Sequence, residues 1–406
     1  MAGALSGTLV LDLTRILAGP WCTQMLADLG ADVIKVERPG SGDDTRHWGP
    51  PWLPEQEGER ADSTYFTSAN RNKRSVSIDI SKPEGQALVR ELAMHADVVV
   101  ENYKVGDLAR YGLDYASLSA LNPKLIYCSI TGYGQDGPFA DRPGYDFVFQ
   151  GEGGMMSVTG EADDKPGGGP QKVGVAITDL MTGMYASIAV LAALNHRNAS
   201  GQGQYIDLAL FDAIVAMGAN HAANYLITGM VPHRYGNAHA AMVPYQVFRT
   251  ADGHIIVAAG NDSQWQRFCA AIERPDLGAD DRYRTAPGRI TNRDALIPVL
   301  EDVFVTQASE YWLSRLTSHN IPNGPINNYE QVFSHPQVVH RGMRVEIPDG
   351  EAGALPVVAN PIRFSETPIE YRLTPPKLGQ HTDQILREVL GKETTQIQAL
   401  KDTKIV

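Results

Sequence analysis

The carboxylate of Asp179 is the one charged group in an otherwise apolar run, Val173–Leu194. By length this run could span a membrane, but a buried charge is costly there and the run is rich in Gly, Ser and Thr, which favours a buried helix of a soluble protein. Asp179 would then lie near the helix start, where free N–H groups and the helix dipole favour an ionised carboxylate. Such a group can be a nucleophile or simply a helix cap, and its position alone does not decide between them.

A cluster of basic residues gives a second candidate site. Arg71, Lys73 and Arg74 fall within four residues of a chain whose net charge is −12. An acidic protein that binds a polyanion must concentrate its cations locally, and arginine matches phosphate by its fork geometry, so the cluster could clamp a phosphate. The alternative is a solvated turn, which is the usual role of a short charged cluster. Both interpretations remain open at this point.

The overall composition bounds the class of protein. The 406 residues are 43% hydrophobic and 20% charged, as in a globular chain of two domains or one large one. We expect no nucleic-acid partner, because a basic face is missing, and no membrane association. The cysteines, Cys22, Cys128 and Cys269, lack metal-ligand spacing, so we expect no metal site and free thiols. The first residues lack a secretory or Arg-rich leader, which predicts a cytoplasmic protein, or a mitochondrial one after removal of a presequence.

The elements that must position Asp179 begin with a β-α-β unit. We predict a strand over Leu9–Thr14, a helix with Pro20 in its first turn, and a second strand over Ala31–Glu37. Such a unit indicates a Rossmann-like parallel α/β sheet. The turn between the first strand and the helix, TRILAGP, has no G-x-G-x-x-G fingerprint, so we do not expect NAD or FAD.

Further elements continue this pattern. Parallel sheets bind ligands beyond the carboxyl ends of their strands, which is where Arg38, Arg46 and Asn102 fall. The remaining elements predicted for this part are a helix over Pro83–Ala96, strands over Ala96–Glu101 and Lys124–Thr131, and a helical segment VGDLARYG that presents Arg110.

The pattern changes from about Thr228 onward. A hairpin with its turn at Asp252-Gly253 is followed by helices to about Ser318 and by a Pro/Gly-punctuated connection, IPNGPINN. We therefore expect a small α+β domain inserted into a large α/β domain. The predicted boundaries are 1–225 and 331–406 for the large domain and 226–330 for the small one.

In their order and spacing, segments along nearly the whole chain resemble the class III CoA-transferases, the family of formyl-CoA transferase and carnitine CoA-transferase. The segments are LDLTRILAGP, ADLGADVIKVERPGSGD, NRNKRS, ADVVVEN, SITGYGQDGP, ITDLMTGMYA, GQGQYIDLALFDA and LGQHTDQIL. Each alone is weak, but the series is specific. The resemblance implies a Rossmann-like large domain with an inserted small one, and a homodimer of two interlocked chains.

The resemblance implies that Asp179, in ITDLMTG, is the family's nucleophile. Its carboxylate would attack the donor thioester, giving an aspartyl–acyl anhydride and CoA thiolate. The thiolate would return to form an aspartyl-CoA thioester, which the acceptor acid attacks before the steps run backwards. Coenzyme A is then a co-substrate, and no tightly bound cofactor is expected. A helix start would keep the carboxylate ionised.

The resemblance also implies contacts to CoA. The loop Gly236–Val243 would offer backbone N–H groups to the oxyanion, although it has GNAHAAMV where formyl-CoA transferase has polyglycine. By motif position, the nucleotide of CoA would contact Arg38, Asn102 and Arg110, and its adenine side would contact Ile78. The pantetheine and the reacting centre would lie near Arg142 and Tyr145. Leu17 stands where formyl-CoA transferase has a glutamine.

The acceptor is expected to be a dicarboxylic acid. The segments ANYLITG, GNAHAAMVPYQVF and IPNGPINN are most similar to the succinate–hydroxymethylglutarate (glutarate) CoA-transferases, with itaconate CoA-transferases as near relatives. We therefore expect transfer from an acyl-CoA such as succinyl-CoA to glutarate, hydroxymethylglutarate, itaconate or a similar acid. The second carboxylate needs a cation or several donors, and Arg46, Arg71 and His239 are the candidates.

Two alternatives remain open. The 2-methylacyl-CoA racemases of the same fold use the histidine of a G-H-D motif as a base, and this chain has Gly144-Tyr145-Asp146 instead. A phenol ionises only near about pH 10 and is a poor base at neutral pH. The other alternative is a non-catalytic CoA-binding subunit, against which Asp179 argues. Turnover of succinyl-CoA with a dicarboxylate would separate these possibilities.

Overall fold

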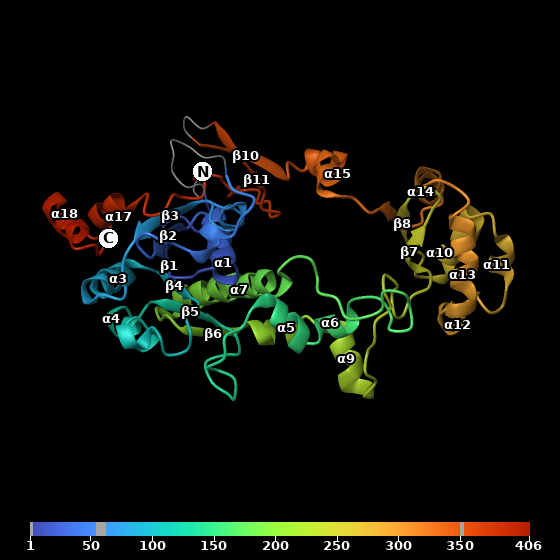
Figure 1. Ribbon diagram of the computed structural model, residues 1–406, viewed down its shortest axis with the longest axis horizontal. Helices are drawn as coiled ribbons and strands as arrows, with labels where there is room; N and C mark the ends of the chain where they lie inside the picture. The colour runs from blue at the N-terminus through green and yellow to red at the C-terminus, as the bar shows by residue number, and fades with distance from the viewer. Residues whose placement is uncertain (1–2, 54–61, 350–352) are drawn as a thin grey trace. The chain divides into compact units, whose positions relative to one another are not determined.

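The computed structural model describes residues 3–53, 62–349 and 353–406, and the chain divides into two compact units (Figure 1). The first unit comprises Met1–Met155, Val173–Ala223 and Gln337–Val406, and the second comprises Met156–Lys172 and Asn224–Pro336. This division differs from the predicted domains mainly in residues 156–172, which the sequence places in the large domain.

The first unit is built on a six-stranded parallel sheet with the order β3-β2-β1-β4-β5-β6. The predicted parallel α/β fold is therefore confirmed. The chain order reverses between β1 and β4, and in such sheets the crevice beyond the strand ends at this point is the usual ligand site. The strands are β1 (Leu9–Asp12), β2 (Asp32–Glu37), β3 (Lys73–Ser77), β4 (Val98–Glu101), β5 (Ile126–Thr131) and β6 (Tyr205–Ala209).

Helices cover both faces of this sheet, which explains why the central strands β1 and β4 are almost continuously apolar. In β4, Val98 and Val100 belong to the core on the side of α1 and α7, whereas Val99 belongs to the core on the side of α3 and α17. The helices of this unit are α1 (Ala18–Asp28), α2 (Thr64–Thr67), α3 (Pro83–His95), α4 (Tyr115–Leu121), α5 (Asp146–Glu152), α7 (Ile177–Ser200), α8 (Leu210–Ala216), α17 (Thr382–Glu388) and α18 (Thr394–Asp402), and β10 (Arg344–Pro348) pairs with β11 (Ala354–Val358).

The second unit contains the predicted hairpin, followed by helices. Strands β7 (Tyr245–Arg249) and β8 (His254–Ala258) pair antiparallel around the Asp252-Gly253 turn. The IPNGPINN segment, predicted to be a connection, contributes β9 (Asn323–Pro325), which pairs with β8. The helices are α10 (Asp262–Ala271), α11 (Pro275–Ala279), α12 (Ala286–Thr291), α13 (Arg293–Phe304), α14 (Ser309–Ser318) and α15 (Tyr329–Ser334), while α6 (Met155–Val158), α9 (Ala219–Thr228) and α16 (Pro336–His340) each contain a boundary between the units.

The helix that carries Asp179 is α7, which runs from Ile177 to Ser200 and ends at Gly201 in the left-handed conformation (φ 75°). Its length and apolar composition would permit a membrane span. In the fold it packs against α1 and β5, as expected for a core helix. Gly183 allows this close packing, because a Cβ atom there would lie 2.6 Å from the carbonyl oxygen of Ala18.

The basic cluster is neither a solvated turn nor a surface clamp. Lys73 begins β3 and is fully buried, with its Nζ 3.1 Å from Asp12 Oδ2. Arg71 is also buried and pairs with Asp28, and Arg74 pairs with Asp32 and Glu388. Both sequence interpretations are corrected, because each cation already has a carboxylate partner within the protein.

Candidate active site

The carboxylate of Asp179 is half-buried in the first turn of α7, three residues after the N-cap Ala176. No hydrogen bond or ion pair to this carboxylate is recorded among the described residues. Burial raises its pKa to about 7, and the charge of Asp146 adds to the effect. The expectation that the helix start alone keeps Asp179 ionised is therefore corrected: removal from water outweighs the favourable position. The result is a carboxylate that is more basic than usual, and in its ionised form such a group can act as a nucleophile.

Two neighbouring groups shape the electrostatics around Asp179. Asp146 begins α5, and Tyr65 lies in α2 with its ring 5.3 Å from that of Trp48. Burial raises the pKa of Tyr65 to about 12, with further contributions from Asp179 and Asp146. The hydroxyl of Tyr65 is thus protonated at neutral pH and able to donate a hydrogen bond. Sequence reasoning missed Tyr65, for which no motif gives a signal.

Four of the predicted CoA contacts lie at one edge of the sheet. Ile78, Arg38, Leu17 and Asn102 follow β3, β2, β1 and β4, which are neighbours in that order. Leu17 and Ile78 are buried, so their side chains belong to the core and only their backbones can face a ligand at this edge. Arg38 is exposed, and no ion pair is recorded for it in the described ranges.

Asn102 joins two of the loops at this edge. Its Oδ1 accepts the backbone N–H of Arg15 at 2.9 Å, and its Nδ2 donates to the Arg15 carbonyl at 2.7 Å. These bonds connect the loops after β1 and β4, between which the strand order reverses. Asn102 therefore holds the ligand-side edge in shape, in addition to the nucleotide contact expected from the sequence.

The comparisons with known proteins agree with this arrangement. The sequence profile of CoA-transferase family III matches residues 5–382. The chain belongs to CoA-transferase family III. It is 48% identical over 391 residues to the succinate–glutarate CoA-transferase of Agrobacterium fabrum, which covers 96% of this chain and 97% of that protein. It is 44% identical over 402 residues to the human succinyl-CoA:glutarate CoA-transferase, covering 99% and 90% of the two chains.

A solved structure gives the same result for the fold. The crystal structure of a CAIB/BAIF family protein from Brucella suis superposes with a TM-score of 0.86 at 47% identity, covering 96% of this chain and 100% of that one. The predicted family is therefore confirmed, and the chain is a CoA-transferase enzyme.

We expect Arg38, which is exposed at the ligand-side edge of the sheet in this CoA-transferase, to contact a phosphate of CoA. Replacing it with alanine should raise the KM for acyl-CoA roughly ten- to a hundredfold, the value of one charge-assisted phosphate contact, with little change in the KM for the acceptor. Steady-state kinetics with each substrate varied in turn would measure this. Arg387→Ala, at an exposed position in α17, is the matched control, and equal effects of Arg38→Ala on both substrates would show that Arg38 is structural.

The other three predicted CoA contacts are exposed. Arg110 lies in a short 3-10 helix, Ala109–Tyr111, instead of the predicted helix, and it pairs with Asp107. The guanidinium carbon of Arg142 lies 3.8 Å from the ring centre of Phe139. Tyr145 is 64% exposed and directly precedes Asp146. The backbone thus places Tyr145 next to the surroundings of Asp179, whereas no contact of Arg110 or Arg142 with Asp179 is recorded in the part of the chain that the structure describes.

The structure does not support Arg46 and Arg71 as acceptor-binding residues of the transferase. Arg46 is 2% exposed, and its Nε and Nη2 donate to the two oxygens of Glu37 at 2.8 and 2.7 Å. Arg71 binds Asp28 in the same bidentate manner, at 3.0 and 2.5 Å. Each guanidinium would have to give up a buried carboxylate to meet a substrate, which leaves that carboxylate unpaired and is strongly unfavourable.

His239 lies in the second unit and is half-buried. Its Nδ1 accepts the N–H of Ala241 at 2.9 Å, so the neutral ring carries its proton on Nε2, which can donate to a carboxylate. In the same loop, the N–H groups of Gly236, Ala238, His239 and Ala241 are already hydrogen-bonded within this unit. They are therefore poor candidates for the predicted oxyanion contacts.

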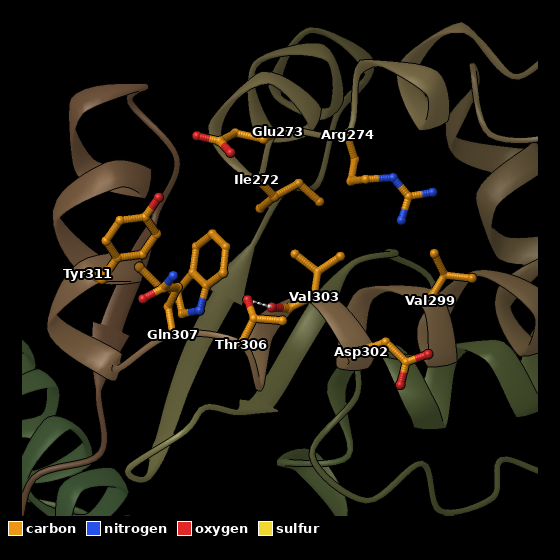
Figure 2. A pocket seen from close by; sticks show the side chains of 10 residues that line it. Ile272, Glu273, Arg274, Val299, Asp302, Val303, Thr306, Gln307 and Tyr311 are labelled. Atoms are coloured by element: carbon orange, nitrogen blue, oxygen red, sulfur yellow. Dashed lines mark hydrogen bonds between the residues drawn. The ribbon is translucent and has the colours of Figure 1, made fainter.

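Asp179 does not line either of two cavities formed by the described residues. One of about 470 Å³ lies in the second unit and is lined by apolar and charged side chains, among them Val299, Arg274 and Asp302 (Figure 2). The other, of about 390 Å³, lies beside Glu101 and Tyr205 in the first unit. Within the described ranges, no group of three or more His, Cys, Asp or Glu side chains could hold a metal ion.

Proposed function

We propose that this CoA-transferase moves CoA from succinyl-CoA to a dicarboxylic acid, with glutarate as the foremost acceptor, through covalent intermediates on Asp179. The observation that carries the proposal is the unpaired, half-buried carboxylate of Asp179 in the first turn of α7. The two glutarate CoA-transferases described above, at 44–48% identity over nearly the full length, support the choice of substrates.

The reaction consists of two exchanges at the carboxyl group of Asp179. The Asp179 carboxylate attacks the succinyl carbonyl, the C–S bond breaks, and a mixed anhydride and CoA thiolate form. The thiolate then attacks the aspartyl carbonyl, which releases succinate and leaves an aspartyl-CoA thioester. A carboxylate of the acceptor attacks this thioester and expels CoA thiolate, and the thiolate attacks the acceptor carbonyl of the second anhydride. Acyl-CoA leaves, and Asp179 is free again.

The surroundings of Asp179 favour these steps on electrostatic grounds. Burial disfavours its charged form, and both the anhydride and the thioester of Asp179 are uncharged. Acylation therefore removes a buried charge that the described residues do not compensate. The protonated hydroxyl of Tyr65 is our candidate for stabilising the negative oxygen that develops in each tetrahedral intermediate.

Different residues bind the two substrates. The CoA nucleotide binds at the sheet edge formed by Arg38, Leu17, Ile78 and Asn102, with Arg110, Arg142 and Tyr145 as the outer contacts. His239 is the remaining candidate from the sequence for the second carboxylate of the acceptor, through its Nε2–H.

We also propose a homodimer, with the interlocked arrangement that the family resemblance implies. Tyr185, Ile188 and Leu191 are 38%, 59% and 36% exposed and lie three residues apart on α7, so they form one apolar stripe. Light scattering should give twice the mass of one chain, and Ile188→Glu should shift the protein toward single chains. Met94→Glu, at an exposed methionine of α3, is the control; a wild-type mass of one chain would refute the dimer.

The function itself is tested by product formation. Succinyl-CoA and glutarate should yield glutaryl-CoA and succinate in equal amounts, measured by liquid chromatography and mass spectrometry. Hydrolysis of succinyl-CoA without a new acyl-CoA, or no turnover with any dicarboxylate, would refute the proposal and favour a non-catalytic CoA-binding role.

A further inference from the structure

The first turn of α7 is capped by a residue from another helix. Ala176 occupies the N-cap position and has no side chain that can accept a hydrogen bond. Instead, Oδ1 of Asp146, in the first turn of α5, accepts the backbone N–H of Thr178 at 2.7 Å. Thr178 is fully buried and directly precedes Asp179. Because the first N–H groups of a helix have no partner within it, this bond fixes the backbone from which the Asp179 side chain projects.

Gln150 fixes the second oxygen of Asp146. Its Nε2 donates to Oδ2 of Asp146 at 2.8 Å, and its Oε1 accepts the N–H of Val173 at 2.8 Å. Gln150 is fully buried, so this amide cannot exchange its partners for water. The carboxylate of Asp146 is thus held at both oxygens, and the segment that leads into α7 is held by the same side chain.

The charge of Asp146 also acts on Asp179. Among the described residues, the titratable groups that interact with Asp179 are Asp146 from α5 and Tyr65 from α2, and Asp43 acts in turn on Tyr65. Burial is the larger cause of the raised pKa of Asp179, and the Asp146 carboxylate is the second. A more basic carboxylate is the stronger nucleophile toward a thioester.

We propose that Asp146 is the positioning residue for the nucleophile: it caps α7 from outside the helix, sets the direction of Asp179 and places a negative charge beside it. This inference rests on the proposed function, because it assigns Asp146 a task in the reaction of Asp179. Asp146 is the last residue of the Gly144-Tyr145-Asp146 motif, in which Tyr145 stands where the racemases have their histidine.

The test is the pH dependence of kcat/KM in Asp146→Asn and Asp146→Ala. Asparagine can still accept the Thr178 N–H but lacks the charge. The wild-type rate should fall below about pH 7, where Asp179 becomes protonated. In Asp146→Asn this acidic limb should move down by roughly one pH unit, so that the rate at pH 6, relative to its plateau, rises roughly fivefold. A purely structural loss would lower the rate at every pH by the same factor.

Asp146→Ala removes the cap as well as the charge, so its kcat at pH 8 should fall more than tenfold and lie below that of Asp146→Asn. Circular dichroism and CoA affinity show whether each variant is folded. Asp212→Asn, the same change at an exposed position in the first turn of α8, should leave the limb in place. An unmoved limb in Asp146→Asn, or a wild-type kcat in Asp146→Ala, would overturn the inference. If the wild type transfers no CoA at any pH, it is the proposed function that fails.

Discussion

Replacing Asp179 with alanine should abolish CoA transfer and leave the fold and the affinity for CoA largely intact. The loss should be roughly 10⁴-fold or more in kcat, as for other enzymes deprived of a covalent nucleophile. The physical reason is that Asp179 is a half-buried carboxylate in the first turn of its helix with no recorded hydrogen bond or ion pair in the described ranges, whereas the first-turn carboxylates Glu84 and Asp212 are exposed. Asp179→Asn, which keeps the shape but cannot form an anhydride, should be equally inactive.

The opposite hypothesis makes a different prediction. If Asp179 only helped to start α7, its loss would cost about 1 kcal/mol of stability and would not change the rate by orders of magnitude. Chemical denaturation, CoA titration calorimetry and the transfer assay on the same preparations distinguish the two. Substantial turnover by a correctly folded Asp179→Ala protein would end the covalent mechanism.

Dicarboxylic acids should be better acceptors than monocarboxylic acids of the same length by about a hundredfold in kcat/KM, the value of one charged hydrogen-bonded pair. A monocarboxylic acid has no second carboxylate to pair with the polar or cationic group of the pocket. Binding it therefore removes that group from water without giving it a partner, which is unfavourable. The comparison is glutarate, itaconate and isotope-labelled succinate against valerate and butyrate, at fixed succinyl-CoA. His239→Ala should selectively reduce the advantage of glutarate over valerate, because it removes the Nε2–H donor.

Substitutions of Arg46 and Arg71 serve as a comparison for His239→Ala. Since both are buried in bidentate pairs, their substitution should lower the rates with glutarate and valerate together, through stability. If valerate, oxalate or formate reacts as well as glutarate, the assignment to dicarboxylates is wrong, although the chemistry at Asp179 could survive.

The elements that could be predicted from the sequence are those with a regular apolar pattern or a recognisable turn. The β-α-β start, α3, α7 and the hairpin around Asp252-Gly253 all show apolar patterns or turn residues, and each is present in the structure. Strand β3 was not predicted, because KRSVS looks like a charged turn. Lys73 can occupy a buried strand because Asp12 and Asn70 accept hydrogen bonds from its Nζ. The charged partner, Asp12, lies 61 residues earlier, so no local pattern shows it.

The same limit applies to the active site. The order of the motifs along the chain points to Asp179 as the candidate nucleophile, and the strand order explains why Arg38 and Asn102 lie at the same edge of the sheet. The raised pKa of Asp179 depends on burial and on Asp146, which lies 33 residues earlier and is brought close by the packing of α5 on α7. Properties that arise from such tertiary contacts cannot be obtained from one segment at a time, and they are the ones for which the sequence prediction needed correction.

The double hydrogen bond between Asn102 and Arg15 has a consequence for the thermodynamics of CoA binding. Because it joins the loops after β1 and β4 without any ligand, a nucleotide that binds at this edge, as we propose, would meet loops that are already ordered. Such binding would cost less conformational entropy on the protein side than binding that first has to order these loops. In this part of the molecule, the energetic cost of organising the site is met during folding and not in each catalytic cycle.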